Sequence, residues 1–96
     1  MGTMLLNAIW IGSFKATRLE AEQLHAKVLL AAEESKIGDL VSNVASTKGV
    51  VQFMIMPSGS KEGWPENDAW EDLVALSAKW CAGTHFIIKR LYVGET

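Results

Sequence analysis

The sequence predicts a single α+β domain, residues 1–96, in which a three-stranded sheet packs against two long helices and one short helix. The predicted chain order is β-α-(α)-β-α-β. Two observations support this prediction. The chain has 96 residues, too few for two domains, and 49% of them are hydrophobic, which is enough to form one core. Short apolar runs with strand composition also alternate with longer segments in which apolar residues recur at helical spacing.

The first strand is predicted for residues 4–12 and the first helix for residues 18–34. The strand segment is rich in Leu, Ile and Trp and ends at a Gly-Ser pair, which favours a turn. Thr17 and Glu20 have the spacing of a capping box, in which each side chain binds a free backbone amide at the start of a helix. Apolar residues form two separate stripes on this helix, so we expect it to pack against two neighbours.

A short helix and a second strand are expected next. Apolar residues recur at helical spacing over residues 37–45, and Ser35 is placed to cap this helix, although Gly38 weakens it by about 1 kcal/mol relative to alanine. Residues 50–56 form a dense apolar run that is too short for a helix and begins with two valines. They are therefore predicted to form a strand, which Pro57 ends.

The third helix, residues 68–82, is the most clearly amphipathic segment of the chain. Asp68 and Glu71 have the spacing of an N-terminal cap, and Gly83 follows where a C-terminal cap is expected. A final strand is predicted for residues 84–93. Both of its faces are largely apolar.

The predicted strands carry more apolar surface than helices on one face can cover. Because soluble monomers seldom expose large apolar patches, we expect a homodimer that buries the uncovered face or edge of the sheet. The alternative is that the short helix and the loop around Trp64 wrap round the sheet and cover this surface.

Composition excludes several classes of protein. Nine Lys and Arg against eleven Asp and Glu give a net charge of −2, so the excess of positive charge expected of a nucleic-acid binder is absent. One Cys excludes an internal disulfide, and two His leave too few ligands for structural zinc. We expect no cofactor, no bound metal and a cytoplasmic location. The apolar N-terminal run is far shorter than the roughly 20 residues of a membrane span, so no membrane contact is expected.

No residues have the spacing of a catalytic site. Cys81 and His85 are four residues apart, but Cys81 is predicted at the C-terminal end of a helix, where the helix dipole raises a thiol pKa. A buried, unreactive thiol is the interpretation we favour. The segment 59–61 resembles a phosphate-binding loop only in composition, because Lys61 is followed by Glu62 instead of Ser or Thr. The protein is therefore not expected to be an enzyme.

The loop of residues 57–67 is the strongest candidate for a binding region, because loops on small scaffolds commonly carry function. It contains Lys61, Glu62 and Trp64, and an exposed tryptophan can anchor a protein partner. The first functional hypothesis is a protein-interaction module in which these three residues bind an unidentified protein. In the alternative interpretation, Trp64 folds back over the core and only holds the loop in place.

The second functional hypothesis is a small-ligand binding domain, or a minor enzyme, with a pocket between the sheet and the long helices. Such pockets are mostly apolar, with few polar groups. The candidate lining residues are Trp10, His25, Trp70, Trp80 and Tyr92. His25 is expected to lie at the edge of an apolar stripe and not to bind a metal, because no second ligand stands at metal spacing.

One hexapeptide of the loop, Gly-Ser-Lys-Glu-Gly-Trp at residues 59–64, resembles a motif of small uncharacterised phage and prophage proteins. An acidic helix with Trp80 near its end and a short final strand follow, so the resemblance covers about residues 53–93. In that pattern an Asp precedes the first glycine, where this chain has Ser58. The resemblance implies a phage or bacterial origin and a cytoplasmic setting, and it carries no activity and no catalytic residues.

Overall fold

The computed structural model describes residues 5–59 and 65–94 of the chain. Its elements are, in chain order, strand β1 (Leu5–Ser13), helix α1 (Arg18–Glu34), the 3-10 turn η1 (Gly38–Leu40), strands β2 (Ala45–Thr47) and β3 (Val50–Ile55), helix α2 (Pro65–Cys81) and strand β4 (Ile87–Gly94). The α+β class and both long helices are confirmed. Within the described residues, no helix is long and apolar enough to cross a membrane.

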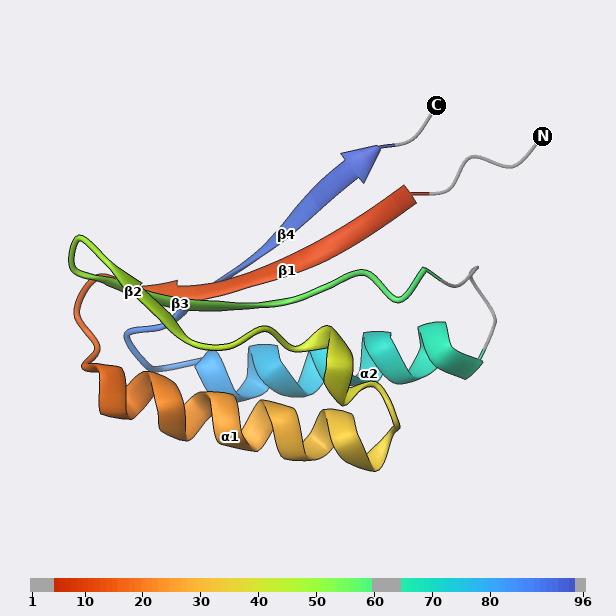
Figure 1. The fold of residues 1–96 in the computed structure, drawn as a ribbon, viewed down its shortest axis with the longest axis horizontal. Helices are drawn as coiled ribbons and strands as arrows, with labels where there is room; N and C mark the ends of the chain where they lie inside the picture. The colour runs from red at the N-terminus through yellow and green to blue at the C-terminus, as the bar shows by residue number, and fades with distance from the viewer. Residues whose placement is uncertain (1–4, 60–64, 95–96) are drawn as a thin grey trace.

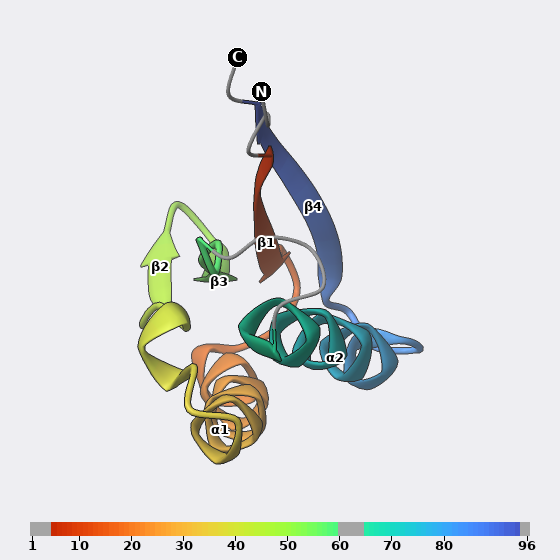
Figure 2. The ribbon, with the colours of Figure 1, turned by 90° about the vertical axis from the view of Figure 1, so that its right-hand side faces the viewer.

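The strands form one antiparallel sheet in the order β2-β3-β1-β4. With the two helices as crossovers, this order is the ferredoxin-like, or split βαβ, topology. Both helices pack on the same face, α1 below β2 and β3 and α2 below β1 and β4 (Figures 1 and 2). The opposite face of the sheet carries no helix of the described chain.

The prediction of three strands and a short helix at residues 37–45 was wrong. Of the predicted helix, only Gly38–Leu40 are helical, as the single 3-10 turn η1. Ala45–Thr47 instead form β2 at the edge of the sheet. Lys48 and Gly49 join β2 to β3 with φ angles of 51° and 85°. A two-residue loop with positive φ at both positions is a type I′ hairpin turn, so the Lys-Gly pair reverses the chain between two antiparallel strands.

The core lies between the sheet and the two helices. In β3, Val51, Phe53 and Ile55 alternate toward the helices, and β1 places Ile11 opposite Phe53 and Ile9 opposite Ile55. The helices complete this core with the buried side chains of Leu24, Val28, Trp70 and Leu73. One layer of apolar contacts thus holds both helices against the central strands.

Helix α1 begins with the predicted capping box. The Thr17 hydroxyl accepts a hydrogen bond from the Glu20 amide at 3.2 Å, and the Glu20 carboxylate accepts one from the Thr17 amide at 3.0 Å. This helix packs against both the sheet and α2, but its second apolar stripe is not covered by any of the described residues. Leu19 and Leu30, on the second stripe, are 65% and 60% exposed, so only one face of α1 is buried.

On the helix-free side of the sheet, the indole of Trp10 lies flat over Gly12. A Cβ atom at residue 12 would overlap the six-membered ring of the indole. The Nε1 atom of Trp10 donates a hydrogen bond to Oε1 of Gln52, on the neighbouring strand, at 2.6 Å. The ring is thus held in one orientation by a glycine beneath it and an amide beside it.

Replacing Gly12 with Ala is expected to lower the free energy of unfolding by about 1–3 kcal/mol, because the indole must leave the sheet surface and lose the Gln52 hydrogen bond. The backbone at residue 12 does not have positive φ, so the change adds no strain of its own. Urea unfolding measures the effect. In a Trp10→Leu background the cost should fall, since no indole is displaced, and an equal cost in both backgrounds would contradict this packing.

Candidate functional site

The helix-free side of the sheet is the first candidate site. Side chains of a strand alternate between its two faces, and Ile9, Ile11 and Ile88 point to the core. The intervening side chains point away from the helices. We call this surface the open face, and it comprises Trp10 on β1, Gln52 and Met54 on β3, and Ile87, Lys89 and Leu91 on β4.

The open face is apolar and carries one charge. Ile87 and Leu91 are 43% and 42% exposed, a large fraction for side chains of this type in a sheet. Trp10 is paired in register with Met54 on one side and with Lys89 on the other, so it lies near the centre of this surface. The ammonium of Lys89 is the single charge of the open face. This surface can bury apolar area against a partner but offers no acid or base in a catalytic arrangement.

The residues predicted to bind a protein partner, Lys61, Glu62 and Trp64, lie outside the described residues. Whether Trp64 is exposed or folded over the core therefore stays a prediction. The described chain leaves β3 at Ile55 and enters α2 at Pro65, so the loop is anchored between two well-packed elements.

The residues proposed to line one pocket are spread over different parts of the molecule. Trp10 lies on the open face, whereas Trp70 is 2% exposed in the core, where its Nε1 donates a hydrogen bond to the carbonyl of Met56 at 2.8 Å. Trp80 is half-buried near the end of α2. The structure does not bring these three indoles together. Tyr92 lies on β4, and its side chain is outside the described part of the structure.

His25 takes a structural position on α1. Its Nε2 atom hydrogen-bonds to the carbonyl oxygen of Ser42 at 2.8 Å, and its ring packs edge-on against Phe53, with 5.2 Å between ring centroids. The ring thereby joins the helix to the chain before β2. Within the described residues, no group of three or more His, Cys, Asp or Glu side chains is arranged to hold a metal ion.

The basic residues do not gather on one surface. Arg18 forms an ion pair with Glu22 at 3.7 Å, and Arg90 forms one with Glu71 at 3.0 Å on the helix side of the sheet. Lys89, the neighbour of Arg90, points to the open face. Basic groups dispersed in this way, two of them paired with carboxylates, are a poor match to the continuous phosphate-binding track of a nucleic-acid protein.

Cys81 is buried at the end of α2, as predicted from the sequence. Burial raises the pKa of its thiol, since the thiolate loses hydration. His85 is exposed on the turn before β4, and no hydrogen bond joins the two side chains in the described structure. The pair therefore lacks the activated thiolate of a cysteine nucleophile.

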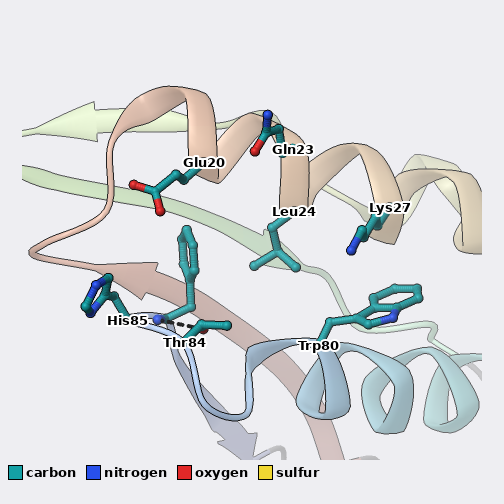
Figure 3. A pocket seen from close by; sticks show the side chains of 8 residues that line it. Glu20, Gln23, Leu24, Lys27, Trp80, Thr84 and His85 are labelled. Carbon is teal, nitrogen blue, oxygen red and sulfur yellow. Dashed lines mark hydrogen bonds between the residues drawn. The ribbon is translucent and has the colours of Figure 1, made fainter.

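A groove between α1 and the end of α2 is the second candidate site (Figure 3). It has a volume of about 530 Å³ and is lined by Glu20, Gln23, Leu24, Lys27, Trp80, Thr84, His85 and Phe86. Hydrogen bonds from the backbone and side chain of Thr17, followed by the charge of His85, lower the pKa of Glu20. Of these residues, sequence patterns pointed to Glu20 as a helix cap, to Trp80 as a pocket residue and to His85 as a possible partner of Cys81, whereas Lys27 carried no local signal.

No protein-family model, no curated protein and no solved structure matches the chain.

The burial of Cys81 predicts slow thiol chemistry. In native protein at mildly alkaline pH, an aromatic disulfide reagent should modify Cys81 at least about tenfold more slowly than in urea-unfolded protein, because the raised pKa reduces the thiolate fraction and the core blocks access. Absorbance of the released thiolate follows the reaction. Equal rates in the native and unfolded protein would contradict the buried position.

Proposed function

We propose that this protein is a non-catalytic protein-interaction module that forms a homodimer through the open face of its sheet. The observation that carries the proposal is the exposed apolar surface of Ile87 and Leu91 on the same face as Trp10, whose indole is held in place by Gly12 beneath it and a hydrogen bond to Gln52. A phage or bacterial origin and a cytoplasmic setting are part of the proposal, supported by the sequence resemblance alone.

Burying the open face is favourable for two reasons. Apolar surface gains about 25 cal/mol for each Å² removed from water, so the exposed parts of Ile87 and Leu91 contribute to association. Trp10 also loses little freedom when it is buried, because its orientation is already fixed. Preorganised aromatic side chains of this kind are typical of residues that dominate binding energy.

A second copy of the chain is the occupant that fits this surface best. The four strands have nine, three, six and eight residues. From strand spacing and rise each face covers roughly 400 Å², so two faces together bury about 800 Å², the size of a weak, reversible interface. An isologous pair also places apolar surface against apolar surface on both sides. The flexible stem of Lys89 can lie along the apolar surface while its ammonium reaches the solvated rim.

The loop with Lys61, Glu62 and Trp64 is proposed as a separate contact for a protein partner. Its support is the sequence, in which a tryptophan stands between a glycine and a proline with charged residues nearby.

The variant Leu91→Lys is expected to weaken dimerisation by about 100-fold or more, since each protomer loses a buried leucine and gains a cation in the interface. Sedimentation velocity over a concentration series gives the dissociation constant. Leu30→Lys is the matched control, because Leu30 is 60% exposed on α1 and far from the open face, and this variant should leave dimerisation unchanged.

Two results would contradict the proposed dimer. One is a monomeric native protein throughout the concentration series. The other is an equal effect of the Leu91 and Leu30 variants, which would show that the surface of association is not the open face. Urea unfolding of both variants confirms that each is folded before association is compared.

A further inference from the structure

The groove beside Trp80 lies in the helix layer, so a dimer formed through the open face leaves it accessible. Its volume of about 530 Å³ is within the range of small-molecule sites. Figure 3 shows Leu24 and Lys27 reaching in from α1, with Trp80 opposite them on α2 and Thr84 and His85 on the turn that follows. The groove is therefore bordered by two elements that the core holds in fixed positions.

The middle of the groove is apolar and aromatic. Leu24 is almost completely buried, and the half-buried side chains of Trp80 and Phe86 flank it. Aromatic side chains favour the faces and edges of other rings at distances of about 4.5–7 Å. A flat ring system is the ligand shape that these three side chains contact best.

The wall formed by the turn after α2 is preorganised. Gly83 has a φ of 76°, as expected of the residue that ends a helix. The Thr84 hydroxyl donates a hydrogen bond to the carbonyl of Cys81 at 2.6 Å and accepts one from the Phe86 amide at 3.1 Å. These bonds fix Phe86 and His85 relative to the helix, so little order has to be gained when a ligand enters.

The two charged groups at the ends of the groove, Glu20 and Lys27, differ in whether they already have a partner within the protein. Glu20 and Lys27 are seven residues apart on α1, which is about 10 Å along the helix axis. Oε1 of Glu20 accepts hydrogen bonds from both the amide and the hydroxyl of Thr17. The ion pairs of the described structure are Arg18–Glu22 and Arg90–Glu71, so Lys27 has no carboxylate partner there. Glu20 keeps its negative charge at the far end, but its Oε1 is already hydrogen-bonded, whereas the Lys27 ammonium beside Trp80 is available to pair with an anion.

We propose that this groove binds a small planar aromatic acid, with its ring between Trp80 and Phe86 over Leu24 and its carboxylate on Lys27. An aromatic amine would meet the free cation of Lys27 at the same position, and a neutral ring would leave that cation without a partner. This site differs from the pocket predicted from the sequence, since among the described side chains of that set Trp80 alone lines it.

The probe for the test is 2-naphthoate, with 2-naphthalenemethanol as its uncharged counterpart. Titration into ¹⁵N-labelled full-length protein should shift the indole N–H signal of Trp80, with a dissociation constant of about 1 mM or tighter, as expected of a ligand of this size. The alcohol should bind at least about fivefold more weakly, because it lacks the charge that Lys27 pairs with.

Matched variants test the proposed carboxylate position. Lys27→Gln should weaken 2-naphthoate binding by about fivefold, whereas Lys27→Arg should change it less than about twofold. Lys79→Gln removes the same charge from a residue that neighbours Trp80 in sequence but does not line the groove, and it should leave the affinity unchanged. Trp80→Leu should abolish the ring contact and reduce the affinity for acid and alcohol alike.

Three outcomes would overturn the proposal. Equal affinity for the acid and the alcohol would show a non-selective apolar site. Equal effects of Lys27→Gln and Lys79→Gln on affinity would show that Lys27 acts only through the overall charge of the protein and does not contact the carboxylate. Shifts at Trp10 without shifts at Trp80 would place the probe on the open face. Folding of each variant is checked from its ¹H–¹⁵N spectrum before titration.

Discussion

The structure depends on the pairing of β1 with strands on both of its edges. β1 is the first element of the chain, yet it lies between β3 and β4, and it points Ile9 and Ile11 into the core between the sheet and the helices. Because side chains alternate along a strand, a slip of one residue would turn Trp10 into the core and expose both isoleucines. The register of β1 therefore decides which side chains form the core and which form the open face.

The two candidate sites follow from the one-sided packing of the helices. Two helices on one face of a four-stranded sheet bury that face and leave the other to solvent or to a partner. In the helix layer, α1 and α2 are held against the sheet, and the groove lies where α2 ends and the chain turns toward β4. The topology creates both surfaces, while the side chains on them determine what each can bind.

Local signals in the sequence were sufficient for most of the elements. The capping box at Thr17 placed the start of α1 correctly, and apolar periodicity identified α2 although the helix begins three residues earlier, at Pro65. β2 was missed because its three residues have no apolar alternation and follow a segment with helical spacing. Its existence depends on the Lys-Gly hairpin turn and on the pairing with β3. The turn is local and the pairing involves a second strand, and neither of them is visible in the spacing of apolar residues.

The candidate sites were harder to predict from the sequence than the helices and strands were. Excess apolar surface on the strands was visible, and the structure gives it a location on the open face. The partner of Trp10, however, is Gln52, which is 42 residues away, and no local pattern connects them. Lys27 is likewise ordinary in sequence, since an exposed lysine on a helix is common. Its distinction is its position beside Trp80, which requires the packing of α1 against α2.

A dimer formed through the open face would resemble a four-layer sandwich, with the two sheets about 10 Å apart and the helices outside. The central position of Trp10 would bring the two indoles close together, while Gly12 keeps each ring low on its own sheet. A larger residue at position 12 would lift the ring and hold the sheets apart. Gly12 therefore has two effects: it stabilises each protomer, and it keeps the open face of that protomer flat enough to pack against a second copy.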